Sequence, residues 1–304
     1  MQEDHLVGYA ISDCNQHQVQ LAQTLNYLAP FNVIELQPER NLWNVDEALP
    51  RIMACPYRGV HAASDNLDLS NPLALRREEA IRKTLASMDL AHLIHAQVLV
   101  LHPVNSNAHL SWEERMLHRD IFLQVFQTAL VPHYHHGRHA YTICLENLEY
   151  PKLPASLEEF IDLFHACSAI HPVGMVLDIP HIWNTRRIIM ENPQLQRHFN
   201  LGNLERGLVD YVTHFLSHYQ PYIKMFHLAN FGTHPVRTHD PVTRGEIHPD
   251  LRVLLPLLRE RPIILEVYTG PISGLKDSQE VVAELVQHAH GSILPAKTDP
   301  RLSS

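Results

Sequence analysis

Acidic and histidine side chains follow six short apolar runs of the sequence, each at the point where the run ends. The residues in these positions are His61, His102, Glu146, Asp178, His227 and Glu266. Moving an ionised carboxylate from water to an apolar environment is unfavourable unless a cation or a protonated partner compensates its charge. Carboxylate oxygens and imidazole nitrogens are ligands of divalent cations, so this pattern predicts metal chemistry.

Four of these residues form a chemically consistent ligand set. Glu146, Asp178 and Glu266 supply oxygens, and His227 supplies a neutral nitrogen. If three carboxylates converge, their repulsion raises their pKa values or requires a divalent cation between them. Three oxygens and one nitrogen suit Mn²⁺, Mg²⁺, Co²⁺, Fe²⁺ or Zn²⁺ and do not choose among these ions. We therefore predict a divalent metal site at these four residues.

The apolar runs alternate with longer segments of helical spacing, which is typical of a parallel sheet covered by helices. Eight runs predict strands, which begin at Leu6, Asn32, Gly59, Gln97, Tyr141, Gly174, Ile223 and Pro262. The sixth run, GMVLDIPH, continues to His181, and the connection after it is the longest. Helices are expected at 16–28, 46–54, 73–94, 112–131, 156–168, 204–218, 251–259 and 278–290.

Eight strands, each followed by a helix, predict the α/β fold class and specifically a (β/α)₈ TIM barrel. The barrel is expected to form a single domain over residues 1–291, and the polar tail at 292–304 is expected to be disordered. Because catalytic groups of such barrels lie at the carboxyl ends of the strands, the six residues should meet at one mouth. The HYHHGRH segment at 133–139 precedes the fifth strand, so we expect a solvated helix end on the opposite face.

The composition excludes several classes of protein. The chain has 304 residues with 24 Lys and Arg against 33 Asp and Glu, a formal net charge of −9, which argues against general binding to nucleic acid. No apolar run approaches the roughly 18 residues of a membrane span, so no membrane partner is expected. Four widely spaced cysteines without a CxxC pair favour a reducing compartment. The first residues lack the features of a signal peptide, and we expect a cytoplasmic location.

Several motifs occur in strand order along the chain: LHP, LEN, LDxxH, FHLAN, GEIHPD and LEVY. With them the sequence resembles the xylose-isomerase-like TIM-barrel superfamily from about Leu6 to His290. That superfamily holds sugar isomerases and epimerases, inosose and dehydroshikimate dehydratases, and endonuclease IV. In the isomerase and epimerase branch, the resemblance implies one divalent metal at the four-residue set, proton exchange by its two glutamates, and contact of His181 with substrate oxygens.

The endonuclease branch implies a larger metal centre. There, the residues that match His61, His102 and His181 are further ligands in a three-metal cluster. The sequence departs from that pattern because Ile179-Pro180 replaces the Thr-Cys of the sixth strand. The Asp-x-His pair after the seventh strand is also replaced by Arg237-Thr238-His239-Asp240, so His239 remains a candidate ligand whose aspartate partner is missing or displaced.

The leading functional hypothesis is a divalent-metal-dependent isomerase or epimerase that acts on a sugar or related polyol. Glu146 and Glu266 would serve as general base and general acid on opposite faces of the substrate. The cation would stabilise the negative charge of the enediolate formed next to the carbonyl. The candidates for contact with the substrate are His61, His102, His181 and Arg237.

Other chemistries remain open on the same barrel. A dehydratase or another lyase would use the same base to expel a β-hydroxyl group. An endonuclease IV-like phosphodiesterase would hold two or three metals and use His61, His102, His181 and His239 as additional ligands. A multi-iron oxidative enzyme fits the same ligand count, and a binding protein without turnover is the last alternative. Neither the substrate nor the oligomeric state is specified, although dimers and tetramers are frequent among proteins of this resemblance.

Overall fold

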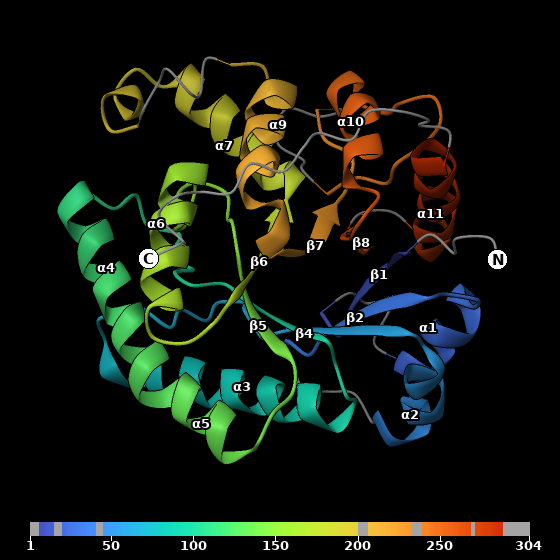
Figure 1. The fold of residues 1–304 in the computed structure, drawn as a ribbon, viewed down its shortest axis with the longest axis horizontal. Helices are drawn as coiled ribbons and strands as arrows, with labels where there is room; N and C mark the ends of the chain where they lie inside the picture. Colours follow the sequence, from blue (N-terminus) through green and yellow to red (C-terminus); the bar gives the residue numbers. More distant parts are fainter. Residues whose placement is uncertain are drawn as a thin grey trace.

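Eight parallel strands form a closed barrel at the centre of the molecule (Figure 1). The computed structural model describes residues 6–14, 20–40, 45–199, 206–232, 239–268 and 271–287. The strands are β1 (Val7–Ser12), β2 (Val33–Gln37), β3 (Tyr57–His61), β4 (Val98–Leu101), β5 (Thr142–Glu146), β6 (Gly174–Asp178), β7 (Ile223–Leu228) and β8 (Ile263–Leu265). Each strand pairs with the next, and β8 pairs with β1, which confirms the predicted TIM barrel.

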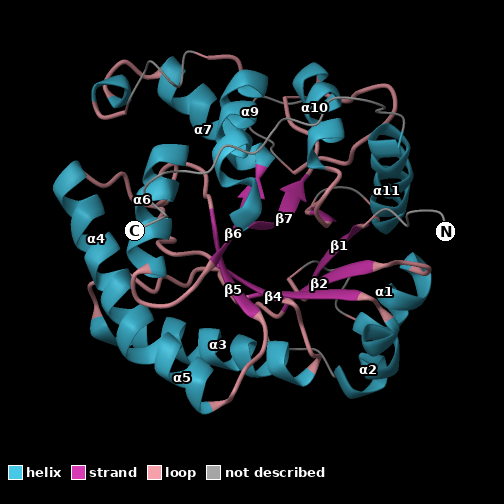
Figure 2. Cartoon of the chain, in the orientation of Figure 1, coloured by secondary structure: helices cyan, strands magenta, loops and turns pink. Residues whose placement is uncertain are grey.

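Helices surround the barrel and cover the outer faces of the strands (Figure 2). They are α1 (Leu21–Leu28), α2 (Val45–Ala54), α3 (Ala74–Leu93), α4 (Trp112–Val125), α5 (Val131–His136), α6 (Leu157–Ser168), α7 (Ile179–Glu191), α9 (Leu208–Tyr219), α10 (Pro249–Leu254) and α11 (Ile272–Gln287). Short π and 3₁₀ segments lie at 126–130, 195–197, 220–222 and 255–258. In the described part of the chain, no helix combines the length and apolarity that crossing a bilayer requires. The predicted tail at 292–304 lies outside the described residues.

The start of α7 differs from the sequence-based prediction. The apolar run suggests a strand as far as His181, whereas β6 ends at Asp178 and a helix begins at Ile179. The side chain of Asp178 accepts a hydrogen bond from the backbone N–H of His181, and such a cap satisfies an N–H group that the first helical turn leaves free. Pro180 lies in that first turn, where its missing N–H costs nothing. A strand-end carboxylate therefore also initiates a helix.

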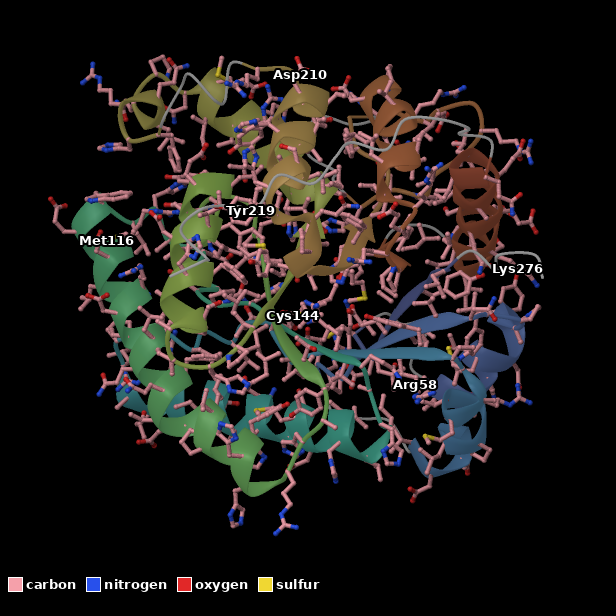
Figure 3. The ribbon with its side chains drawn as sticks, in the orientation of Figure 1. Arg58, Met116, Cys144, Asp210, Tyr219 and Lys276 are labelled. Carbon is pink, nitrogen blue, oxygen red and sulfur yellow. The ribbon has the colours of Figure 1, made fainter. Side chains whose placement is uncertain are left out.

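Side chains alternate between the outside and the inside of the barrel along each strand. A large apolar cluster packs between strands and helices, while a smaller one inside the barrel draws on seven of the eight strands. Its members are Ala10, Val33, Val98, Val100, Cys144, Val176, Met225 and Ile264. Cys144 appears near the middle of the ring of strands in Figure 3. This interior cluster excludes water below the mouth of the barrel and forms the floor of the site described next.

Candidate metal centre

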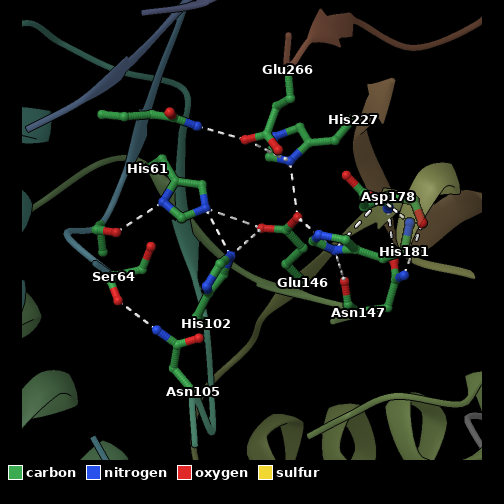
Figure 4. Close-up of polar contacts among 12 residues, drawn as sticks. His61, Ser64, His102, Asn105, Glu146, Asn147, Asp178, His181, His227 and Glu266 are labelled. Atoms are coloured by element: carbon green, nitrogen blue, oxygen red, sulfur yellow. Dashed lines mark hydrogen bonds and ion pairs between the residues drawn. The ribbon is translucent and has the colours of Figure 1, made fainter. Parts of the chain in front are cut away.

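The polar residues at the carboxyl ends of the strands, which form the mouth of the barrel, lie next to the interior apolar cluster along each strand. Because the side-chain period of a strand is two residues, the residue two positions after an inward apolar one also points inward. This relation links Val33 to Glu35, Val100 to His102, Cys144 to Glu146, Val176 to Asp178, Met225 to His227 and Ile264 to Glu266. The alternation of the strands thus gathers acids and imidazoles into one layer (Figure 4).

The four residues predicted as metal ligands come together in this layer. Glu146, Asp178, His227 and Glu266 each offer one ligand atom, all within 4.8 Å of one another, and each side chain is buried. His227 Nδ1 lies 3.0 Å from Glu146 Oε1 and 3.5 Å from Glu266 Oε1. Ligand atoms that share a divalent ion at bond lengths of about 2.0–2.2 Å lie roughly 3 Å apart. The donor set and its spacing therefore fit one such ion.

A second group shares Glu146 with the first. His61 Nε2 and His102 Nε2 each lie 3.1 Å from Glu146 Oε2, and the two nitrogens are 3.0 Å apart. The other oxygen of Glu146 faces His227, so this one carboxylate joins both groups. Figure 4 shows it between the two imidazoles of this group and His227. A carboxylate placed in this way has the geometry of a bridging ligand.

A third group shares Asp178. Its members Asp178, His181 and His239 again offer ligand atoms within 4.8 Å of one another. His239 Nε2 lies 3.9 Å from Asp178 Oδ2 and 3.5 Å from Glu266 Oε2. The aspartate next to His239, Asp240, instead joins an antiparallel bridge with Asn230 through its backbone. Arg237, predicted to contact substrate, lies outside the described residues.

The pKa values of these residues reflect a buried excess of negative charge. Burial raises the pKa of Asp178 well above its usual value, and Glu146 and Glu266 add to this shift against the opposing charge of His239. Burial alone would also raise the pKa values of Glu146 and Glu266, but the neighbouring His227 lowers both. Protons on the imidazoles thus balance the buried carboxylates, and a divalent cation could replace these protons.

Two further observations support a cation. Asp178 Oδ2 is buried and has no hydrogen-bond partner among the described residues. His227 Nε2 lies 3.1 Å from Glu35 Oε2, which leaves Nδ1 directed at Glu146 and Glu266. A carboxylate behind a histidine fixes the ring orientation in many metal sites. The two-residue step from Val33 places Glu35 in the same layer.

Two amide side chains that the sequence analysis did not single out hold the candidate ligands in place. Asn147 Oδ1 accepts a hydrogen bond from the backbone N–H of Asp178 at 2.8 Å, and Asn147 Nδ2 donates to the backbone carbonyl of Asp178 at 2.9 Å. Gln37 Nε2 donates to Glu266 Oε1. The LEN motif contains Asn147, but its partner on β6 becomes visible only in the fold.

A cavity of about 430 Å³ opens over these groups. Its lining includes His102, His181, His239 and Glu266 together with hydroxyl and amide side chains such as Ser64 and Asn105. His61 is not part of the lining, and its side chain is only 3% exposed. The charged residues of the lining also include Glu39, Asp65, Glu149 and Lys152. The volume suits a small polar molecule.

Known proteins share this architecture. The family described as xylose isomerase-like TIM barrel matches residues 44–287. No curated protein sequence matches the chain. Among solved structures, a D-tagatose 3-epimerase-like protein aligns with a TM-score of 0.66 and 15% identity over 92% of this chain and 97% of that one.

Two other solved structures represent different chemistries. Endonuclease IV from Thermus thermophilus aligns with a TM-score of 0.61 and 16% identity, over 93% of this chain and 99% of that one. The probable 3-DHS dehydratase AsbF from Bacillus anthracis aligns with a TM-score of 0.59 and 15% identity, over 91% of this chain and 98% of that one. At these identities the likeness shows the fold alone, since one fold hosts many activities.

Proposed function

The chain belongs to the xylose isomerase-like TIM-barrel family, and from this premise we propose that it is a divalent-metal-dependent isomerase or epimerase. Its substrate is a sugar or related polyol, and its reaction moves a proton at the carbon next to a carbonyl group. The observation that carries this proposal is the placement of two buried glutamates around one imidazole. Glu146 Oε1 and Glu266 Oε1 both face His227 Nδ1, and the second oxygen of each faces another histidine.

The residues divide into ligands and proton carriers. Asp178 and His227 would chiefly hold the cation, which would supply Lewis-acid stabilisation of negative charge on two adjacent substrate oxygens. Glu146 and Glu266 would exchange protons with the substrate carbon as general base and general acid. A carboxylate that is both buried and flanked by imidazoles can pass a proton to a neighbouring ring instead of to water. His102 lies beside Glu146 and His239 beside Glu266, so each glutamate has such a neighbour.

The cavity supports a polyhydroxylated substrate. Ser64, Asn105 and Asn107 contribute hydroxyl and amide groups to the lining, and these hydrogen-bond sugar hydroxyls without requiring charge. His102 and His181 line the cavity and are the imidazoles we expect to orient substrate oxygens. The carboxylates that line the cavity disfavour a polyanion such as a nucleic acid, whose binding depends on neutralised phosphates.

The proposal is tested by isotope exchange. Metal-loaded protein is incubated with a panel of ketoses, inososes and keto acids in D₂O, and deuterium next to the carbonyl is measured by NMR. Incorporation that requires Glu146 and Glu266 would support the proposal. Incorporation accompanied by loss of water would instead identify the dehydratase alternative. Absence of exchange with every candidate, together with cleavage of abasic DNA, would overturn the isomerase proposal.

A specific observation favours a second candidate, a phosphodiester hydrolase with two or three metals. The three ligand groups are contiguous because Glu146 and Asp178 each belong to two of them. The substitution His102→Ala separates the two proposals. A single-metal isomerase keeps its bound ion when His102 is replaced, whereas a multi-metal hydrolase loses one ion per chain.

A further inference from the structure

A separate group of side chains that could bind a metal lies at the end of the barrel opposite its mouth. Asp89 is on α3, His133 is on α5, and His139 stands in the turn before β5. Their ligand atoms lie within 4.8 Å of one another, and His133 Nε2 is 2.9 Å from Asp89 Oδ1. Because His139 precedes β5 and Glu146 ends it, the group sits at the amino-terminal end of the barrel. Figure 1 shows α5 beside α3 in this region.

His139 is the member whose environment needs an explanation. Its residue is only 8% exposed, and its ring stacks on Tyr141 with centroids 5.1 Å apart. Neither Nδ1 nor Nε2 has a hydrogen-bond partner among the described residues. Native proteins seldom leave a buried polar atom unpaired, because neither tautomer of the ring then recovers the hydrogen bonds it made with water. Two unpaired nitrogens on one buried imidazole indicate a missing partner.

The backbone is shaped to hold this ring in place. A Cβ at Gly137 would lie 2.5 Å from the His139 ring, so a larger residue there would require the ring to shift. Arg138 adopts a φ of +51°, a left-handed conformation that is uncommon outside glycine. The turn thus folds His139 back under α5, where the N–H of His139 donates to the Tyr134 carbonyl.

The neighbouring side chains complete a ligand set. His92, one turn after Asp89 on α3, places its ring centroid 4.9 Å from that of His139. Two imidazoles and a carboxylate, with a further imidazole beside them, form a ligand set for tetrahedral Zn²⁺ or a similar borderline ion.

We propose that Asp89, His133 and His139 form a second divalent metal site, selective for Zn²⁺-like ions, with His92 or water as the fourth ligand. The ion connects α3 to the turn between α5 and β5 and has a structural role independent of the mouth of the barrel. The solvated helix end expected for this segment describes His135 and His136, which are exposed, but not the buried His139.

Zinc content of matched variants tests the site. Full-length protein is stripped with a chelator, dialysed against Zn²⁺ and analysed for bound zinc per chain. His133→Ala and Asp89→Asn should each bind one Zn²⁺ fewer than the unaltered protein. His136→Ala is the matched control, because His136 is exposed on the same helix and outside the group, and it should keep the full zinc content. Equal zinc in His133→Ala and the unaltered protein, or an equal loss in His136→Ala, would overturn the proposal.

Cobalt gives a second readout that does not depend on activity. Tetrahedral Co²⁺ with nitrogen and oxygen ligands absorbs visible light, and this band should be weaker in His133→Ala than in His136→Ala. Zn²⁺ should also raise the melting temperature by less in His133→Ala than in the control, since one stabilising ion is lost. Identical Co²⁺ spectra in the two variants would count against the site. The residues at the mouth are unchanged in both variants, so these results are independent of the isomerase proposal.

Discussion

His61 and His102 approach each other with 3.0 Å between their Nε2 atoms, and both nitrogens contact the same oxygen of Glu146. At this distance only one of the two nitrogens can direct a proton at the other. Burial lowers the pKa of both rings, but the hydrogen bond and charge of Glu146 raise the pKa of His61 to about 10. The pKa of His102 falls to about 4, since the charge of His61 adds to burial there. The pair therefore shares one proton in the metal-free protein.

This proton predicts the pH dependence of the metal-free protein. The folded state raises the pKa of His61 from 6.5 to about 10, so its contribution to stability is complete below pH 6.5. That contribution is lost as the pH rises through about 10. The free energy of unfolding, measured with urea in the presence of chelator, should therefore decrease over this range. His61→Gln should reduce the slope, and an unchanged slope in this variant would contradict the assignment to His61.

Replacing Glu266 tests proton transfer. Glu266→Gln should slow deuterium exchange into the substrate by about 10²- to 10⁴-fold, because an amide cannot accept or return the proton. Bound metal is quantified in the same preparations, so that a loss of the ion is not mistaken for a loss of the proton carrier. Glu79→Gln, an exposed position on α3, serves as the control and should exchange at the original rate. Equal exchange rates for the two variants would remove Glu266 from the mechanism.

Glu35 is a positioning residue for His227. Its carboxylate lies 3.1 Å from His227 Nε2, whereas the other ring nitrogen, Nδ1, faces Glu146 and Glu266. We expect Glu35→Gln to weaken metal affinity by about 10- to 100-fold, since the ring loses a charged partner that fixes its orientation. Competition with a chelator of known affinity measures this change. If the affinity stays the same, the contact is only structural and the stability of the metal-free variant should fall instead.

Replacing Asn147 should lower the stability of the protein rather than directly remove a catalytic group. Asn147→Ala removes two hydrogen bonds to the backbone of Asp178 and leaves its buried N–H unpaired, at a cost of about 1–3 kcal/mol. The free energy of unfolding of the metal-free protein should fall accordingly. Asn107→Ala removes an exposed amide and should change it little. Similar values for both variants would show that the hydrogen bonds of Asn147 are replaced by others.

The alternation of apolar and polar residues made much of this architecture predictable. Val176 and Asp178 share one face of β6, and Met225 and His227 share one face of β7. Once the apolar residue of each pair is assigned to the barrel interior, the sequence spacing alone places the polar residue there too. The same rule applied to Val33 would have placed Glu35 in the same layer as the candidate ligands. Contacts between residues on different strands cannot be predicted in this way. The 3.0 Å distance between His61 Nε2 and His102 Nε2 depends on how β3 and β4 are staggered in the closed barrel.

The start of α7 could not be predicted for a related reason. The residues after Asp178 are apolar, and a short apolar run has the same appearance in a buried strand and in the first turn of a packed helix. Ile179 and Ile182 are buried in the structure, which either assignment would have required. Only the position of the barrel mouth decides where the strand must stop.

Asp178 couples the order of a helix to the chemistry of the mouth. One of its oxygens caps the first turn of α7, and the other points at the neighbouring ligands. A substitution at this position would therefore unravel local structure and change the ligand set at the same time, and a loss of turnover alone would not separate the two. Hydrogen–deuterium exchange at the backbone amide of His181 would report ion binding at Asp178 separately from turnover. The exchange should slow when a bound ion restricts the Asp178 carboxylate.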